Sequence, residues 1–385
     1  MATVKDSKES RTIFLMLTNQ CNLRCSYCYE INKHKAEIRV DTALQTIRQD
    51  IEKNCNIFKD FTIVFHGGEP FLSFNIMSYI ADVIWSEYTD IPIVCTATTN
   101  GTLVTAKEKK WLTENRHRFV CILSLDGGRE THNRNRCNSY DNIDRAFFRS
   151  TWPKQPVKMT IVPDTLPDMY KNIMELYSEG FDVNPSMAGE VSWKQERDVP
   201  IFISELDKLV HFYIENKQYY PCKMLDISPV LFSPQNKISH NRACGAGTNI
   251  IVYDIEGHPY PCHTFITDFN QSYDAHIIEP IFSKLRDNKG LALSPLCQGC
   301  YAYPACSPCY GLNYSKRGDI GAIDNFNCIF TKIRIAAAAK MYSLMLLSSN
   351  PRSYLPLKNK TDTEMANMIA GIMALQEVQV NPLVD

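Results

Sequence analysis

Three cysteines lie within eight residues of one another, directly after a β-rich segment near the start of the chain. Cys21, Cys25 and Cys28 follow the segment 12–17 with the spacing C-x3-C-x2-C. A compact loop with three thiolates can hold three irons of a [4Fe–4S] cluster, and the fourth iron then stays open to chelate a substrate or cofactor. The alternatives are a zinc site, which would need a fourth ligand nearby, or three thiols packed as core.

A second group of cysteines lies far along the chain and shows little apolar periodicity. Such a stretch cannot build an apolar core and needs metal to order it. Seven thiols are too many for one four-ligand metal, so two cubane clusters or one or two zinc sites are the alternatives. The seven are Cys244, Cys262, Cys297, Cys300, Cys306, Cys309 and Cys328.

Composition narrows the class of protein. The chain has 385 residues with 15 cysteines and no visible export signal, which favours reduced thiolates that hold metal in the cytoplasm over a disulfide framework. The net charge of −1 argues against nucleic acid as the main partner. No apolar run approaches the length of a membrane span.

The first half of the chain alternates short β-rich runs with amphipathic stretches. Asp41 is predicted to cap the first helix, and Gly180 to follow the last one. Repeated βαβ units mean a parallel sheet, which we expect to curl into a partial (β/α)6 TIM-type barrel; an open doubly wound sheet is the alternative. The predicted strands are 12–17, 61–65, 91–96, 119–125, 158–162 and 182–185, and the predicted helices are 41–55, 74–88, 105–114, 142–151 and 167–179.

The pattern changes after residue 200. A helix is expected at 201–217, another at 327–347, and a last one at 363–378 that carries several methionines. We therefore predict an irregular cysteine-rich iron–sulfur domain followed by C-terminal helices. The predicted divisions are a barrel at 1–200, a bridging region at 201–243, the cysteine-rich domain at 244–347, and a linker with the final helix at 348–385.

Short polar motifs follow three further predicted strands. His66-Gly-Gly-Glu69-Pro offers a carboxylate that can accept a hydrogen bond from an ammonium group, with glycines that admit a bound group. Ser124 and Asp126 lie on one side of the fourth strand, where they could bind hydroxyl groups. Active sites of βα barrels lie at the C-terminal ends of strands, although each motif alone is also typical of a turn.

Together with the first cysteine loop, these motifs resemble the radical S-adenosylmethionine (radical SAM) enzymes. The resemblance implies that Cys21, Cys25 and Cys28 bind a [4Fe–4S] cluster whose open iron chelates S-adenosylmethionine. One electron then generates a 5′-deoxyadenosyl radical that abstracts hydrogen from a substrate. It further implies a set of cofactor-binding residues: Tyr27 near the adenine, Gly67, Gly68 and Glu69 near the ammonium, Asn100, Ser124 and Asp126 along the cofactor, and Arg136 at the carboxylate.

The second cysteine region resembles the SPASM extension, which carries two auxiliary [4Fe–4S] clusters. By this resemblance Cys244, Cys262 and Cys309 hold the first auxiliary cluster, with an open iron or Cys222 as the fourth ligand. The second is held by Cys297, Cys300, Cys306 and Cys328. The chain departs from the usual pattern because only two residues, not three, separate Cys306 from Cys309.

The resemblance implies a peptide or protein substrate and an electron donor such as flavodoxin or ferredoxin. Only 20 residues precede Cys21, so we expect no leader-binding module there, and a separate leader-binding protein is a candidate partner. Sulfatase maturases place an aspartate where this chain has His263, which favours a maturase of ribosomal peptides. His263 and His66 are the candidate catalytic residues. The alternatives are a sulfatase maturase and a non-catalytic, metal-bound interaction protein.

Overall fold

The structure is a computed structural model in which the chain forms two compact units. The first unit comprises Met1–Thr160, Lys171–Glu190 and Gly245–Asp287, and the second Ile161–Tyr170, Val191–Cys244 and Asn288–Asp385. Part of the predicted bridging region, at 228–243, lies outside the described residues. Those are 10–30, 32–189, 191–227, 244–266, 273–287, 294–297, 300, 302–303, 306 and 308–377, with side chains in the last helix through 373.

A parallel sheet forms the centre of the first unit. Four of its strands follow one another in chain order, with spatial order β4-β3-β2-β1, and two more strands form a separate pair. A parallel bridge between Ser124 and Lys158 connects the end of β4 with β5. The predicted α/β fold with a parallel, barrel-type sheet is confirmed, and each predicted strand is found within a few residues. The strands are β1 Ser10–Thr18, β2 Asp60–Gly67, β3 Ile93–Thr99, β4 Phe119–Leu123, β5 Val157–Ile161 and β6 Val183–Met187.

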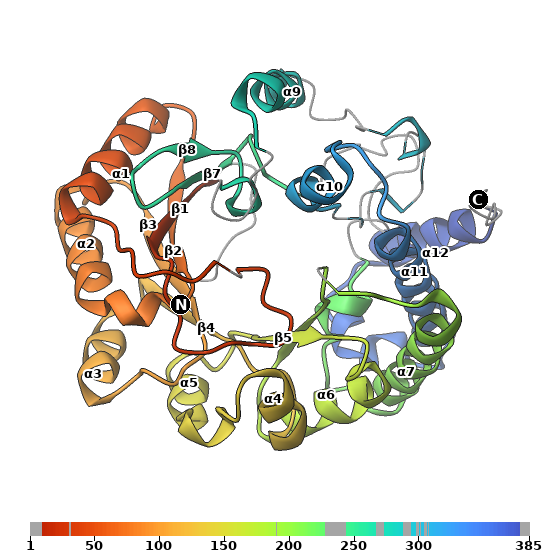
Figure 1. Ribbon diagram of the computed structural model, residues 1–385. Helices are drawn as coiled ribbons and strands as arrows, with labels where there is room; N and C mark the ends of the chain where they lie inside the picture. Colours follow the sequence, from red (N-terminus) through yellow and green to blue (C-terminus); the bar gives the residue numbers. More distant parts are fainter. Residues whose placement is uncertain are drawn as a thin grey trace. The chain divides into compact units, whose positions relative to one another are not determined.

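Helices lie outside these strands, as Figure 1 shows for α1, α2, α3 and α5. Their inward faces are apolar; Ile47 and Ile51 of α1, for example, are fully buried. The helices that follow the first five strands are α1 Val40–Asn54, α2 Phe74–Glu87, α3 Ala106–Asn115, α4 Arg129–Asn135 and α5 Arg145–Thr151, both after β4, and α6 Met169–Ser178.

Of the two predicted helix ends, one is wrong and the other is confirmed. The predicted cap at Asp41 is wrong, because α1 begins one residue earlier with Arg39 at the N-cap, and Asp41 lies in the first turn. An acidic residue there still favours the helix through its dipole. Gly180 follows α6 as predicted, with φ +82°, a conformation that favours glycine. The short helix α4 is absent from the prediction because its polar sequence has no apolar period.

An additional strand from the cysteine-rich half of the chain completes the sheet of the first unit. Strand β7, Ile250–Tyr253, pairs in parallel with β1 and continues into β8, Pro259–Tyr260, which pairs antiparallel with β7. The run Ile-Ile-Val in β7 suits a buried strand, and its pairing covers an otherwise open edge of β1. The β7–β8 hairpin therefore carries Cys262 and His263 back to the barrel strands. Helix α9, Ala275–Asp287, ends this unit.

A buried ion pair ties β1, α1 and the segment before β7 together. Arg11 donates through Nε and NH2 to the carboxylate of Asp50, at 2.9 and 2.7 Å, and through NH1 to the carbonyl oxygen of Thr248 at 3.0 Å. The hydroxyl of Tyr253 donates to the same carboxylate at 3.0 Å. These bonds compensate the buried charges of Arg11 and Asp50. Removal of either side chain would leave the other charge buried without a counter-ion.

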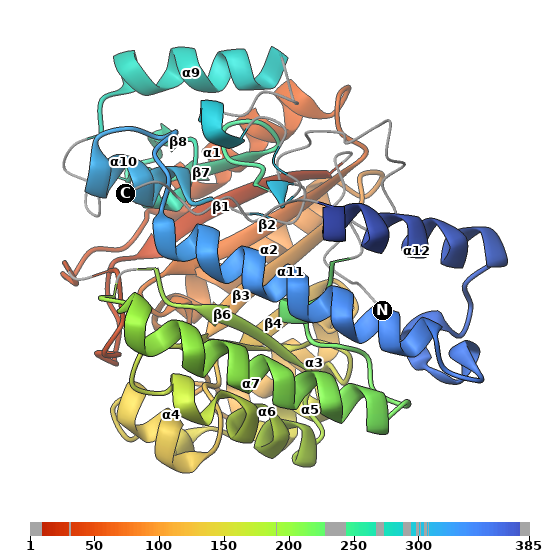
Figure 2. The ribbon, with the colours of Figure 1, turned by 90° about the vertical axis from the view of Figure 1, so that its right-hand side faces the viewer.

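The second unit is mainly helical. Helices α7, Gln195–Glu215, and α11, Asn325–Leu346, run side by side (Figure 2). Phe330 of α11 packs edge-on against Phe202 of α7, with ring centroids 4.9 Å apart, and against Trp193. The unit also contains α10, Tyr310–Arg317, and α12, Asp362–Glu377. The expected helices at 201–217, 327–347 and 363–378 are thus found with shifted ends.

The segment between α11 and α12 differs from the linker that its prolines suggest. It forms two short 3-10 turns, Pro351–Ser353 and Leu355–Leu357, in which Tyr354 and Leu357 are buried. The backbone N–H of Leu355 donates to the carbonyl oxygen of Lys217 at 2.8 Å. Aromatic and leucine side chains anchor this segment despite its proline content. Within the part of the chain that is described, no helix is long and apolar enough to cross a membrane.

We expect Arg11→Met to lower the free energy of unfolding of the first unit by about 3–5 kcal/mol, because Asp50 would remain buried without its cation. Urea denaturation followed by circular dichroism measures the change. The control is Arg48→Met, which removes the exposed pair between Arg48 and Glu87 and should cost less than about 1 kcal/mol. Equal losses in the two variants would contradict this account of the buried pair.

Candidate functional site

The first cysteine loop lies directly after β1, and its three thiols are partly exposed. The backbone N–H of Cys28 donates to the carbonyl oxygen of Cys25 at 3.1 Å, and that of Ser26 to Asn135 of α4 at 2.9 Å. Burial raises the pKa of Cys21 and raises that of Cys25 to about 11, and the other cysteines of the loop add to both shifts. Three thiols that repel one another as thiolates are a donor set that a bound metal cluster would stabilise.

Two glycines let the end of β2 pack against the backbone that enters this loop. A Cβ atom on Gly67 would lie 2.2 Å from the carbonyl oxygen of Thr18, and one on Gly68 equally close to that of Gln20. The N–H groups of Gly68 and Glu69 donate to these same two oxygens, at 3.1 and 2.8 Å. The glycines thus fix the cysteine loop onto the second strand, a role that the sequence alone does not distinguish from contact with a ligand.

Glu69 is buried, and the surrounding chain holds its carboxylate in place. Its Oε1 accepts from the hydroxyl of Thr99 at 2.8 Å and from the N–H of Phe71 at 3.1 Å, and its Oε2 accepts from the N–H of Asn100 at 2.7 Å. Burial raises the pKa of Glu69, and these hydrogen bonds oppose the shift. The side chain of Asn100 bonds in turn to Asn22 of the cysteine loop at 2.8 Å. The ends of β2 and β3 and the loop therefore form one connected structure.

Asp126 joins three further parts of the site. It is fully buried, its Oδ2 accepts from the Tyr27 hydroxyl at 2.7 Å and from Arg136 Nε at 2.9 Å, and its Oδ1 accepts from the N–H of Thr160 at 3.0 Å. The amide of Asn135 adds a longer bond at 3.3 Å. Tyr27 belongs to the cysteine loop, Asn135 to α4 and Thr160 to β5, so one carboxylate sets the positions of three segments.

Arg136 and Tyr27 also contact each other directly. The Arg136 guanidinium carbon lies 5.4 Å from the centroid of the Tyr27 ring. Arg136 donates to Asp126 through Nε. This bond fixes the side chain of Arg136 and thereby orients its two terminal nitrogens. Ser124 is buried just after β4, and its backbone N–H donates to the carbonyl oxygen of Thr99 at 2.9 Å. Predicted cofactor residues from separate parts of the sequence thus form one network.

The two candidate catalytic histidines lie against each other. The rings of His66, at the end of β2, and His263, after β8, have centroids 5.0 Å apart. Phe14 contacts both rings, at 5.8 and 6.0 Å, and Tyr29 lies 5.6 Å from His263. His66 Nε2 is 3.4 Å from the Tyr29 hydroxyl and 3.5 Å from Glu30 Oε1. Desolvation by burial lowers the pKa of both histidines, that of His263 to about 4.

Several residues of this region are missing from the sequence prediction. Glu30 is buried with a raised pKa and lies 3.5 Å from His66 Nε2, and Tyr29 contacts both histidines. Lys158 acts electrostatically on both histidines. Asn135 and its helix α4 complete the bonds around Asp126. Lys158 had a usable signal, since a lysine inside a predicted buried strand must face either solvent or a cavity. The others had none, because only the fold brings them to the site.

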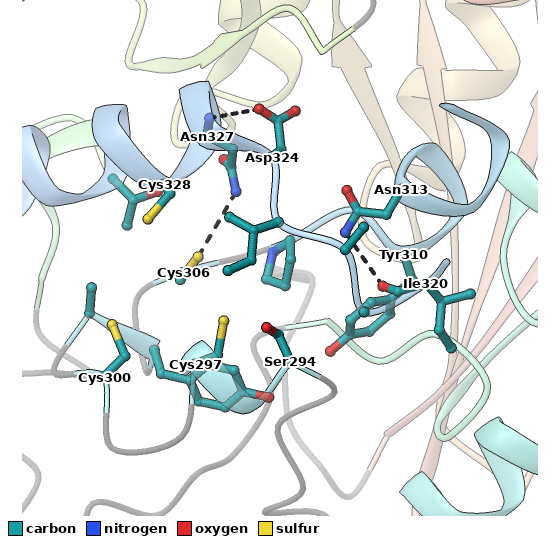
Figure 3. Close-up of a pocket in the computed structure, with 17 residues that line it drawn as sticks. Ser294, Cys297, Cys300, Cys306, Tyr310, Asn313, Ile320, Asp324, Asn327 and Cys328 are labelled. Carbon is teal, nitrogen blue, oxygen red and sulfur yellow. Dashed lines mark hydrogen bonds between the residues drawn. The ribbon is translucent and has the colours of Figure 1, made fainter. Parts of the chain in front are cut away.

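In the second unit, four cysteines line one pocket (Figure 3). Cys328 comes from α11, and the others from the irregular segment before α10, and they repel one another electrostatically. Burial raises the pKa of Cys306 to about 11, and its sulfur accepts from the side-chain amide of Asn327 at 3.9 Å. These are the residues predicted for the second auxiliary cluster, and four thiols around one space are a suitable donor set. The four are Cys297, Cys300, Cys306 and Cys328.

The other predicted set is divided between the units. Cys262 lies in the first unit, where its sulfur is 3.9 Å from His263 Nδ1 and 3.1 Å from the Thr264 hydroxyl oxygen. Cys244 and Cys309 belong to the second, and Cys309 is the N-cap of α10. Cys222, the other candidate ligand, is buried beside Tyr213, whose hydroxyl accepts from the N–H of Cys222 at 3.0 Å. This ligand set stays a prediction.

Comparisons with known proteins agree with the predicted cofactors. A family model described as a 4Fe-4S single cluster domain matches residues 10–139. The chain is 36% identical over 95 residues to the uncharacterized protein MJ0907 of Methanocaldococcus jannaschii, a match that covers 25% of this chain and 32% of that relative. The chain therefore spans about a third of the length of this relative.

Two characterised relatives match more of the chain. The cysteine-type anaerobic sulfatase-maturating enzyme of Clostridium perfringens is 24% identical over 282 residues, covering 64% of this chain and 72% of the enzyme. The antilisterial bacteriocin subtilosin biosynthesis protein AlbA of Bacillus subtilis is 24% identical over 332 residues, covering 78% of this chain and 67% of AlbA.

Solved structures share the fold. The structure of anSMEcpe with bound AdoMet and a peptide has a TM-score of 0.65 at 19% identity, over 86% of this chain and 98% of that one. SuiB of Streptococcus suis bound to its precursor peptide SuiA has a TM-score of 0.57 at 16% identity, over 83% and 76%. The family match, which includes Cys21, Cys25 and Cys28, supports the predicted [4Fe–4S] cluster of the first cysteine loop. AdoMet is bound in the anSMEcpe structure that shares the fold.

We expect Asp126→Asn to destabilise the site, because an amide group would face donors and leave Arg136 buried without a carboxylate. The loss of unfolding free energy should be about 3–5 kcal/mol, with reduced iron content after anaerobic reconstitution. Denaturation and an iron assay measure the two effects. Asp144→Asn is the control, since Asp144 caps α5 through the N–H of Phe147 and asparagine caps equally well. Unchanged stability and iron content in Asp126→Asn would contradict the role of this carboxylate.

Proposed function

We propose that this chain is a radical SAM enzyme with a SPASM-type cysteine-rich extension and that it modifies a peptide. In this proposal the enzyme abstracts a hydrogen atom from a residue of a ribosomally synthesised peptide, and oxidation or crosslinking of that residue follows. The observation that carries the proposal is the joining of the cysteine loop to Glu69 and Asp126, at the C-terminal ends of parallel strands.

The chain's own residues bind, orient and shield. Cys21, Cys25 and Cys28 would hold the cluster, and S-adenosylmethionine bound there supplies a 5′-deoxyadenosyl radical when one electron arrives. Arg136 presents its terminal nitrogens to a carboxylate, while Asp126 fixes its stem. Reactive intermediates need a site from which water is excluded, and the buried network of Glu69 and Asp126 provides a rigid wall for it.

Oxidation of the substrate requires loss of a proton and a second electron after hydrogen abstraction. The rings of His66 and His263 carry nitrogens that can accept a proton, and both lie beside Tyr29. Cys297, Cys300, Cys306 and Cys328, which line one pocket, would hold an auxiliary cluster, and such a cluster would supply an electron acceptor. An external donor, such as flavodoxin or ferredoxin, would supply the initiating electron in the cytoplasm. A separate leader-binding protein is a further proposed partner.

Peptide substrates are supported by the relatives of both kinds. SuiB is solved with its precursor peptide, AlbA acts in subtilosin biosynthesis, and anSMEcpe is solved with a bound peptide. Sulfatase maturation is the second candidate, because the sulfatase-maturating enzyme of Clostridium perfringens aligns with 64% of this chain. His263 at the position where the resemblance implies an aspartate favours the first candidate.

Iron content and cofactor cleavage test the core of the proposal. Anaerobically reconstituted protein should hold about twelve irons, and Cys25→Ala or Cys306→Ala should lose about four each. With dithionite and S-adenosylmethionine, the wild-type protein should form 5′-deoxyadenosine and Cys25→Ala should form almost none. Cys55→Ala is the control, because Cys55 is exposed and outside each predicted ligand set. Cluster-loaded protein without cleavage would favour the non-catalytic, metal-bound alternative.

The choice of substrate is tested with two peptide types. A sulfatase-derived peptide that carries cysteine or serine is compared with short precursor peptides encoded next to this protein's gene. We expect the precursor peptide to lose two hydrogen atoms per modification, detected by mass spectrometry, and the sulfatase peptide to stay unmodified. An aldehyde formed on the sulfatase peptide, trapped by a hydrazine, would select the second candidate instead.

A further inference from the structure

Lys158 on β5 forms no ion pair with the described residues around it. Val157, Met159 and Ile161 are buried on one face of this strand, so Lys158 and Thr160 project from the other face. Lys158 is level with Ser124 through the parallel bridge, and its carbonyl oxygen accepts from the N–H of Leu125 at 2.9 Å. The backbone of Lys158 therefore lies next to the end of β4, where the predicted cofactor residues Ser124 and Asp126 follow the strand.

Electrostatic interactions define what this ammonium group faces. Its charge acts on His66 and His263, and the charges of Arg136 and Asp126 act on Lys158. Desolvation is the main cause that lowers its pKa, Arg136 adds to this effect, and Asp126 opposes it. Lys158 is therefore within electrostatic range of the histidine pair and of the Arg136–Asp126 ion pair.

The carboxylates of the site have partners of their own, and Glu30 lies 3.5 Å from His66 Nε2. Both oxygens of Asp126 accept from the donors described above, and both oxygens of Glu69 do the same. Among the described residues, Lys158 takes part in none of the ion pairs that the structure contains, although its side chain is exposed enough to be reached. A partly desolvated ammonium group without a fixed counter-ion gains most from an anionic ligand.

We propose that Lys158 binds a carboxylate of the peptide substrate and thereby places the target residue beside His66 and His263. The inference rests on the proposed function. The cofactor's carboxylate has its own candidate cation, because Arg136 is held with its terminal nitrogens free of Asp126. The second cation, on β5, therefore suits a second carboxylate. An acidic side chain next to the target residue and the peptide's C-terminal carboxylate share this chemistry.

Calorimetry with short peptides tests the assignment on cluster-loaded protein with S-adenosylmethionine bound. The amidated peptides Gly-Ser-Cys-Glu-Ser-Gly and Gly-Ser-Cys-Gln-Ser-Gly differ only in one carboxylate, and the Gln peptide with a free C-terminus tests the other source. We expect one carboxylate-bearing peptide to bind about ten- to a hundredfold more tightly than the amidated Gln peptide. Lys158→Met should abolish this preference and Lys158→Arg should retain it, while Lys154→Met, an exposed control, should bind like the wild type.

Two results would overturn the proposal. One is equal binding of all three peptides to the wild-type protein, and the other is a loss of S-adenosylmethionine affinity in Lys158→Met as large as in Arg136→Met. The latter would make the lysine part of the cofactor site. A carboxylate preference that depends on Lys158 in a protein that forms no 5′-deoxyadenosine would refute the proposed function and leave this site standing.

Discussion

A single buried carboxylate holds the candidate site together. Asp126 has no contact with solvent and receives donors from the cysteine loop, from α4 and its end, and from β5. A buried charge is tolerated only when hydrogen bonds and an opposite charge compensate it, so the four donors are required as much as the carboxylate. Because Tyr27 lies within the C-x3-C-x2-C loop, the position of the thiols depends on this compensation.

Close backbone packing supplies the second fixed point of the loop. The glycines after β2 allow the strand end to bond to the carbonyl oxygens of Thr18 and Gln20, which no residue with a side chain could do at that distance. On the other side of β1, the Arg11–Asp50 pair and strand β7 hold the hairpin that carries Cys262 and His263. The first unit thus places cysteines and histidines from distant parts of the sequence in one frame.

The charged groups of the site have different roles. The carboxylates of Glu69 and Asp126 each accept several hydrogen bonds, which fix the positions of neighbouring segments. In our proposal, Arg136, Lys158 and the histidines face the ligands. Buried imidazoles with lowered pKa stay neutral and can accept a proton without first losing one. In the second unit, the thiols of Cys297, Cys300, Cys306 and Cys328 gather around one pocket.

The sequence by itself determined the cysteine sets, the motifs at the strand ends and the alternation of strands and helices, because spacing and local periodicity encode them directly. Sequence reasoning missed β7 as part of the sheet, α4, and the contact of His66 with His263. The pairing of β7 and the contact of the two histidines depend on residues far apart in the chain, which meet only when β7 pairs with β1. It also could not tell a glycine that admits a ligand from one that admits the backbone at Thr18. Tertiary structure alone decided which donors Glu69 and Asp126 bind, since partners at such sequence separations leave no local signal.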